Sequence, residues 1–304
     1  MMTWIRSVLA VMVCALATTP ALSAQRSFDK HFDAPPGGKL TLDTDTGSVV
    51  IGGHEGRELI VHADLSGSDD FLARMQINAV QASDGVTVTG HVTRRRWLDW
   101  LFQVSQDKVL YTIQVPRDYP VELRTAGGSL DMRHLNASVH GTTSGGSVTI
   151  REVRGPIDAR TAGGRIDASQ LNGPTSLRTS GGSIHVADST GDLDLHTSGG
   201  GIYLEHLDGK VQASTSGGSV EAKVRTNRGV SLVTAGGSIS LQLPASARGS
   251  IDAHTSGGRA RSTIPLSMTE IASGGELRGA LNGGGDPIFL RTSGGSISIA
   301  PLEE

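Results

Sequence analysis

A four-residue motif, Thr-Ser/Ala-Gly-Gly, recurs along this chain at a fixed interval and constrains its fold more than any other feature. The motif begins at Thr125, Thr143, Thr161, Thr179, Thr197, Thr215, Thr234, Thr255 and Thr292. The first five intervals are all 18 residues, and the later ones are 19, 21 and 37, the last being close to two periods with an insertion. A fixed period of this length indicates a repeat architecture in which each unit is one supersecondary element.

Aliphatic residues occur in pairs two positions apart within each unit. One pair follows the motif directly, as at Val148 and Ile150, and a second comes about nine residues later, as at Ile157 and Ala159. This alternation is typical of a strand with one buried face, so each unit contains two short strands. Strands that repeat in register can pair in parallel about 4.8 Å apart, and single coils cannot bury their apolar faces alone.

The pattern therefore predicts an all-β fold, a single-stranded parallel β-helix or β-solenoid with about 18 residues and two strands per coil. A meander of antiparallel hairpins is disfavoured, because it gives no reason for the same chemistry at every second turn. A left-handed hexapeptide helix would place an aliphatic residue at every sixth position. The observed pairs, with the right-handed preference of parallel crossovers, favour a right-handed coil.

Glycines mark both corners of each predicted coil. The motif itself forms one corner, and segments such as Leu171-Asn172-Gly173-Pro174 form the other. Glycine is expected there because it adopts positive φ without a Cβ clash. The threonine and serine hydroxyls of stacked motifs are expected to satisfy one another and the turn backbone.

The N-terminal residues 1–24 have the composition of a secretory signal peptide. Arg6 gives a positive start, residues 7–19 are apolar, and small residues at 20–24 predict cleavage after Ser23 or Ala24. The apolar stretch of about 13 residues is shorter than the ~20 that span a bilayer, which favours a cleaved signal over an anchor. Cys14, the single cysteine, lies inside this segment. The mature chain is thus expected to lack disulfides and cysteine metal sites, and to reside in the periplasm, on the outer-membrane surface or outside the cell.

The remaining chain is predicted to be one continuous domain with three parts. Residues 25–120 form irregular first coils and a cap, in which residues 42–51 look like a worn copy of the repeat. Residues 121–260 form the regular solenoid. Residues 261–304 form irregular last coils and a second cap, ending in a regular unit at 291–299.

Composition excludes several functional classes. A net charge of −3 argues against nucleic-acid binding by bulk positive charge. No Gly-Lys-Ser/Thr follows a glycine loop, and the ten histidines lack paired spacing, so no phosphate loop, metal or other cofactor is expected. No apolar stretch of spanning length follows residue 24, so no transmembrane segment is expected in the mature chain.

Two pairs of aspartates are the candidate catalytic carboxylates if the protein is an enzyme. Asp131 and Asp167 share one outward column, and Asp158 and Asp194 share another. Within each pair they lie two coils apart, about 9–10 Å, and the regular units lack loops that would wall a cleft. No enzyme is therefore predicted. A carbohydrate-active β-helix enzyme, a polysaccharide lyase or hydrolase, is the alternative.

Arg160, Arg178 and His196 precede the motif threonine in three successive units, with Arg124 and Arg291 in equivalent positions. Stacked, they would form a basic stripe that could bind an anionic glycan, lipopolysaccharide phosphates or an envelope protein. The competing interpretation is a solvated face that neighbouring aspartates neutralise.

The segment 94–102 holds Trp97 and Trp100 beside three arginines. Exposed, it would form a basic-aromatic patch for a membrane interface or a partner. Buried, it would pack over the end of the solenoid.

Three features together carry a resemblance to a known family. A secretion signal is followed by Asp-Thr-Gly-Ser-Val at 45–49, by Val-Leu-Tyr-Thr-Ile-Gln-Val-Pro at 109–116, and by serial motif units that close at 290–297. Over about residues 27–300 the chain resembles the bacterial "putative adhesin" family, a domain of unknown function with β-strand repeats. The resemblance implies a parallel β-helix at or outside the envelope, and it brings no catalytic residues.

Together these observations predict an exported, non-catalytic, adhesin-like binding or structural protein. An envelope scaffold that binds its own kind through the coil ends is a further possibility.

Overall fold

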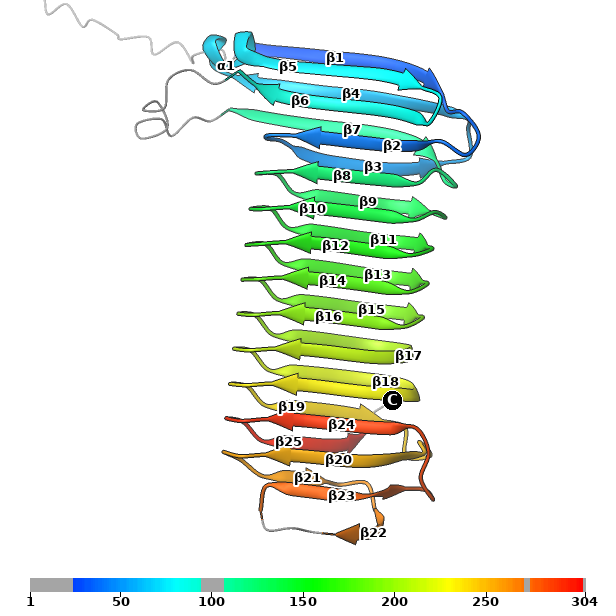
Figure 1. The fold of residues 1–304 in the computed structure, drawn as a ribbon, viewed down its shortest axis with the longest axis vertical. Helices are drawn as coiled ribbons and strands as arrows, with labels where there is room; N and C mark the ends of the chain where they lie inside the picture. Colours follow the sequence, from blue (N-terminus) through cyan, green and yellow to red (C-terminus); the bar gives the residue numbers. More distant parts are fainter. Residues whose placement is uncertain (1–23, 94–106, 271–273, 303–304) are drawn as a thin grey trace, which may run out of the picture.

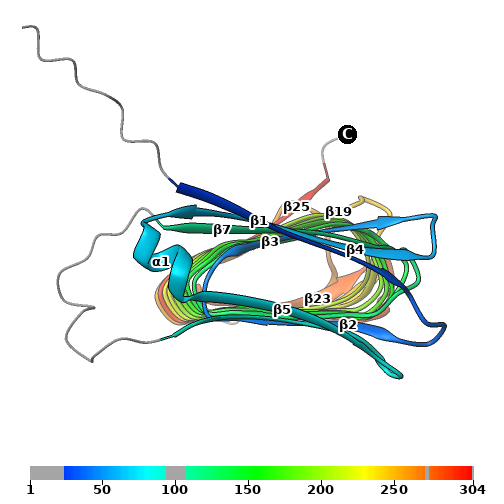
Figure 2. The ribbon, with the colours of Figure 1, turned by 90° about the horizontal axis from the view of Figure 1, so that it is seen from above.

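The computed structural model describes residues 24–93, 107–270 and 274–302. Within these ranges the chain forms 25 strands in one continuous sheet and one short helix, α1 (Asp69–Arg74). The sheet winds into a tall stack of coils with a flattened cross-section (Figures 1 and 2). The fold is therefore an all-β solenoid.

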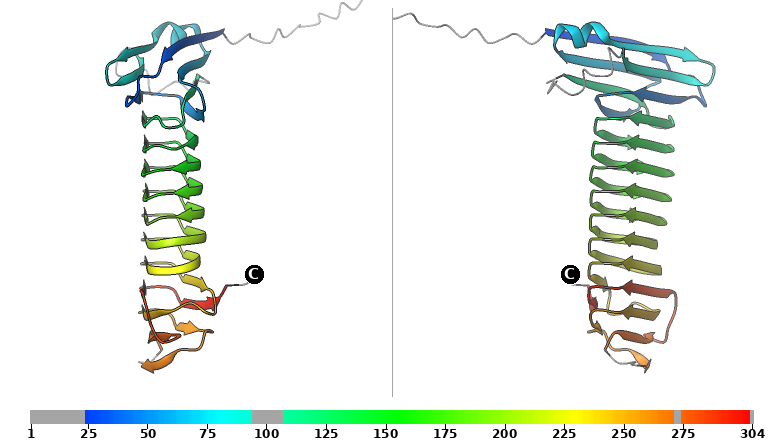
Figure 3. Two further views of the ribbon diagram at one scale, coloured as in Figure 1. Left: turned by 90° about the vertical axis from the view of Figure 1, so that its right-hand side faces the viewer. Right: turned by 60° about the vertical axis from the view of Figure 1, so that its left-hand side comes forward.

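Each regular coil contributes one strand to each of two opposite faces (Figure 3). The strands of the first face, here the β12 face, are β8 (Val121–Thr125), β10 (Val139–Thr143), β12 (Ile157–Thr161), β14 (Thr175–Thr179) and β16 (Leu193–Thr197). Those of the second, the β13 face, are β9 (Leu130–Leu135), β11 (Val148–Arg154), β13 (Ile166–Asn172) and β15 (Ile184–Thr190). β17 (Ile202–Thr215) and β18 (Val220–Thr234) pass through a corner and contribute to both faces.

The regular strands pair in parallel with an offset of one repeat. Ile157 lies opposite Thr175, and Ile166 lies opposite Ile184. The aliphatic pairs predicted from the sequence point inward, and Val148 and Ile150 are fully buried. The core is consequently a narrow double layer of small aliphatic side chains that runs the length of the stack.

The motif threonines bond to backbone and link one coil to the next. Thr161 is buried, and its Oγ1 donates to the carbonyl of Gly146 in the preceding coil (2.7 Å). The same oxygen accepts from the amide of Gly164 in its own turn (3.2 Å). The expectation of bonds to the turn backbone is thus confirmed. The expected hydrogen bonds between stacked threonine hydroxyls do not form in the described motifs, because each hydroxyl instead donates to a glycine carbonyl and accepts from a glycine amide.

Glycine serves the two corners for different reasons. At the second corner Gly155, Gly173 and Gly191 have φ between 131° and 140°, as predicted. The motif glycines do not adopt left-handed φ. The second glycine is required there because the backbone of the preceding coil in the stack lies too close for a side chain. The sequence did not predict that a polar residue near the second corner also turns the chain. His134, Glu152, Gln170, Asp188 and His206 form this column, with φ between 53° and 58°.

The first coils are stacked out of sequence order. They are β1 (Ala24–Asp33), β2 (Lys39–Thr44), β3 (Ser48–His54), β4 (Glu58–Gly67), β5 (Met75–Ala82), β6 (Gly85–Val92) and β7 (Lys108–Pro116). β2 and β3 lie between β6 and β7 on one side and β8 and β9 on the other. Thr44 lies opposite Thr125, so residues 42–51 do form a copy of the repeat.

Antiparallel strands and α1 cover the N-terminal end of the core. β1 pairs with β4, β4 with β7, and β5 with β6, all antiparallel. Phe71 and Leu72 of α1 are buried against the core. Arg26 of β1 donates to the carbonyls of Leu72 (3.0 Å) and Met75 (2.8 Å), which ties the first strand to the helix.

The last coils are also out of order. They comprise β19 (Ile239–Leu243), β20 (Gly249–Thr255), β21 (Ala260–Ser262), β22 (Ser267–Glu270), β23 (Glu276–Leu281), β24 (Pro287–Thr292) and β25 (Ile297–Pro301). β24 pairs with β18 on one side and β20 on the other, and β25 lies between β19 and β21 (Figure 1). The interpretation of the 37-residue interval as two periods in sequence was therefore wrong. The Thr292 unit stacks directly on the Thr234 unit.

Ser189 interrupts an otherwise aliphatic column and supplies a test of the core. It lies between Leu171 and Leu207, is 1% exposed, and its hydroxyl has no hydrogen-bond partner among the described residues. Because a buried hydroxyl without a partner is destabilising, we expect Ser189→Val to raise the free energy of unfolding by about 1 kcal/mol in urea titrations. Ser169→Ala, on the outer surface, should change it by less than about 0.5 kcal/mol. A loss of stability in Ser189→Val would contradict the expectation.

Candidate functional site

The predicted basic residues do form a column on the β12 face. Arg160 lies opposite Arg178, which lies opposite His196, in three successive coils. We call these three residues the basic column. Arg124 lies two coils before Arg160, with Thr142 between them, and Arg291 occupies the same column in the Thr292 coil.

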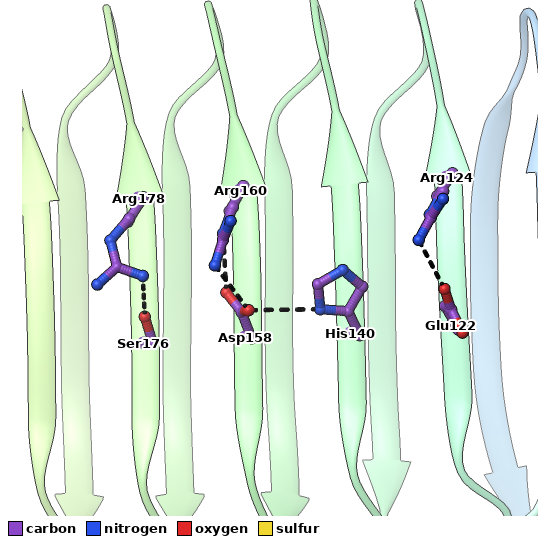
Figure 4. A network of polar contacts seen from close by, with 7 residues as sticks. All are labelled: Glu122, Arg124, His140, Asp158, Arg160, Ser176 and Arg178. Carbon is purple, nitrogen blue, oxygen red and sulfur yellow. Dashed lines mark hydrogen bonds and ion pairs between the residues drawn. The ribbon is translucent and has the colours of Figure 1, made fainter.

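Polar neighbours on the same face engage the basic column (Figure 4). The Arg160 guanidinium donates to both carboxylate oxygens of Asp158, at 3.2 and 3.0 Å. Arg178 donates to Ser176 (2.7 Å) and also pairs with Asp194 in the next coil. An anionic ligand here would have to compete with the aspartates.

Pairing between basic and acidic side chains continues on this face toward the N-terminal end of the stack. Glu122 accepts from Lys39 (3.1 Å) and from Arg124 (2.9 Å). The hydrogen bond from Lys39 is the main cause of a lowered pKa of the Glu122 carboxyl, and the charge of Arg124 adds to it. His140 bridges toward the next coil, with its Nδ1 3.5 Å from Asp158.

The aspartates considered as catalytic candidates are part of this charge pairing. Thr149 separates Asp131 from Asp167, and each of these carboxylates pairs with an arginine, Arg133 or Arg165. Glycoside cleavage requires two carboxyl groups that flank a bond within a site. These carboxylates instead lie two coils apart in an outward column, and an arginine engages each of them.

No group of three or more histidine, cysteine or acidic side chains is placed to hold a metal within residues 24–93, 107–270 and 274–302. Trp97 and Trp100, the other predicted binding residues, lie outside the described residues.

A groove on the β13 face was not predicted from the sequence. It has a volume of about 560 Å³ and crosses β11, β13, β15 and β17. Its lining includes Arg151, Asp167, Ser169, His185, Ala187 and Tyr203. The rings of His185 and Tyr203 lie 4.6 Å apart at 36°. The signal in the sequence was a deviation from the repeat, because Gly201 stands where most units have serine.

Fold and surface together define an all-β solenoid protein with open, charged faces. The chain belongs to the Toastrack DUF4097 family, whose model matches residues 38–300. This confirms the predicted membership of an adhesin-like domain family of unknown function.

Several solved structures are similar to the chain. A "putative adhesin" from Parabacteroides distasonis ATCC 8503 is 10% identical, with 91% of this chain and 97% of that chain covered and a TM-score of 0.47. A "putative adhesin" from Bacteroides fragilis NCTC 9343 is 12% identical at the same coverage, with a TM-score of 0.38. A "putative lipid binding protein" from P. distasonis ATCC 8503 is 12% identical, again at that coverage, with a TM-score of 0.40.

No curated protein matches the chain. In the described part of the chain, no helix combines the length and the apolar character needed to cross a bilayer.

Proposed function

We propose that this protein is an exported, non-catalytic, adhesin-like solenoid that binds a partner at the cell envelope. The observation that carries the proposal is the regular stack itself, which holds outward side chains in columns at the strand spacing of about 4.8 Å. Such columns suit an extended or repetitive partner, because each coil presents an equivalent position. We take the coil to be a right-handed parallel β-helix.

The family match and the signal-like N-terminal sequence support the same function. The family match over residues 38–300 agrees with the adhesin-like resemblance of the sequence. Residues 1–24 have the pattern of a secretory signal, which would deliver the chain to the periplasm, the outer-membrane surface or the exterior. Residues 94–102, with Trp97 and Trp100, remain a proposed site for a membrane interface or a partner.

A polysaccharide lyase or hydrolase is the alternative, favoured only by the β-helix architecture. Two measurements separate the functions. The chain from residue 25 onward should bind envelope preparations saturably, and it should release no reducing or unsaturated ends from a polysaccharide panel. Product release at enzymatic rates would contradict the binding function.

The basic column gives a mutational test of this function. We expect Arg160→Ala with Arg178→Ala to weaken binding to anionic envelope preparations roughly threefold to tenfold at low salt, because two cationic donors are lost. Stability should change by less than about 1 kcal/mol, since both ion pairs are exposed.

The control is Arg225→Ala with Arg228→Ala, which makes the same charge change at the corner of β18. Unchanged binding in the Arg160/Arg178 variant, or an equal loss in the control, would eliminate the column as the binding surface.

A further inference from the structure

The groove on the β13 face is a built hollow in an otherwise regular surface. The outward column that runs across it reads Arg151, Ser169, Ala187 and Glu205 in successive coils. Two small side chains thus lie between two long ones, which leaves the hollow of about 560 Å³. From the Arg151 coil to the Glu205 coil the groove crosses three strand spacings, about 14 Å.

An aromatic platform lies at one end of the groove. A Cβ on Gly201 would lie 2.9 Å from the hydroxyl oxygen of Tyr203 and 3.0 Å from its ring carbons. Gly201 is buried, so the phenol ring lies along the strand and covers it. A serine, present at this position in most other units, would displace the ring. The loss of the repeat residue therefore creates room for a flat ring, and the ring of His185 in the preceding coil lies 4.6 Å from it.

The polar groups of the groove are available to a ligand. Within the described part of the chain, no hydrogen bond or ion pair engages the Arg151 guanidinium, the Tyr203 hydroxyl or the His185 ring nitrogens, and the contact between the two rings leaves their polar atoms free. The basic column differs, because Asp158, Asp194 and Ser214 engage its three side chains. A ligand that binds donors without partners does not have to break an existing ion pair first.

The carboxylates of the groove add acceptors of fixed orientation. Asp167 accepts from Arg165 (2.8 Å) and Glu205 from Lys223 (2.8 Å). The hydrogen bond from Lys223 is the main cause of a lowered pKa of the Glu205 carboxyl, which keeps it an acceptor. A ligand with many hydroxyl groups can donate to such carboxylates and accept from arginine.

We infer that this groove binds an acidic oligosaccharide, with one sugar ring on Tyr203 and a carboxylate of another sugar at Arg151. The inference rests on the proposed binding function and names its ligand class. A flat aromatic ring fits the apolar face of a pyranose, and a guanidinium fits a carboxylate with two parallel hydrogen bonds. A peptide strand would need a free sheet edge, which this face does not offer. A lipid tail would need an apolar lining, whereas Arg151, Asp167 and Glu205 place charges along this groove.

Calorimetric titration of the chain from residue 25 onward tests the inference. The probes are oligomers of galacturonate and of alginate, with a neutral cello-oligosaccharide of equal length for comparison. We expect an acidic oligomer to bind. Tyr203→Ala should lose about tenfold or more in affinity, whereas Tyr203→Phe should stay within about threefold. Arg151→Gln should lose about tenfold for the acidic oligomer and should not affect the neutral one.

The outcomes distinguish the groove from the basic column and from the proposed function. Retained affinity in Tyr203→Ala, with circular dichroism showing a folded chain, overturns the inference. Loss only in the Arg160→Ala/Arg178→Ala variant would also overturn it, while assigning the binding to the other face. No binding of any acidic oligomer overturns the inference alone, because saturable binding to envelope preparations is measured separately.

Discussion

Replacing Gly164 by alanine is expected to lower the free energy of unfolding by roughly 3–5 kcal/mol, the range of severe backbone and packing clashes. The new Cβ would lie 2.0 Å from the carbonyl oxygen of Gly146 and 2.4 Å from its carbon. That carbonyl already accepts the hydroxyl of Thr161, so it cannot move without breaking the link between coils. Glycine is therefore required at position 164 because the backbone of the preceding coil is so close, although the φ of Gly164 itself would tolerate a side chain.

Gly163 is the matched control, one residue away in the same turn. A Cβ there would lie 3.7 Å from the nearest backbone oxygens, which is ordinary contact. We expect Gly163→Ala to change stability by less than about 1 kcal/mol in either direction. Urea unfolding and hydrogen exchange in the adjacent coils measure both variants. Equal effects of the two substitutions would show that the turn, and not the distance between coils, requires the glycines.

Deletion of residues 287–304 is expected to release the whole segment 244–286 from the stack. The deletion removes β24 and β25, whose Ile288, Leu290, Ile297 and Ile299 are fully or almost fully buried. β20 and β21 reach the rest of the sheet through β24 and β25, and β22 and β23 reach it through β20. Limited proteolysis should cut the deleted chain within 244–286, while residues 25–243 stay protected.

Excision of Thr179–His196 provides the comparison, because it also removes one coil. The cut ends, Arg178 and Thr197, rejoin in the repeat register, and the coils above and below present equivalent edges. We expect this chain to fold and to resist protease, since coil stability depends mainly on nearest neighbours. Global unfolding after the excision, or a protected 244–286 segment after the C-terminal deletion, would contradict this account.

The coil could be predicted from the sequence because its determinants are local. Aliphatic pairs such as Val148 and Ile150 define the strands, and their 18-residue spacing defines which residues stack. The order of the coils could not be predicted, because the Thr292 unit has the same edge chemistry as every other unit. One local feature of the sequence does indicate the changed order. The 21-residue interval before Thr255 contains extra residues around 244–248, which carry the chain past one level of the stack.

Of the two candidate surfaces, the basic column could be predicted from the sequence and the groove could not. The basic column followed from the period, since Arg160 and Arg178 are one repeat apart. Their pairing with Asp158 and Asp194 depends on side-chain orientation, which the period does not determine. The groove was missed because it arises where the repeat is broken, at Gly201 and at the small residue Ala187.

The out-of-order last coil also means that the stack cannot close until residues 287–301 are in place. A chain that emerges from its N-terminus presents residues 249–262 before the strands that must lie above them. Until residues 287–301 arrive, the growing stack ends at β18 and β19 with an unpaired edge. Unpaired strand edges are sites of aggregation and cleavage. β24 and β25 thus close the stack, because the edges of β18 and β19 stay unpaired until residues 287–301 are in place.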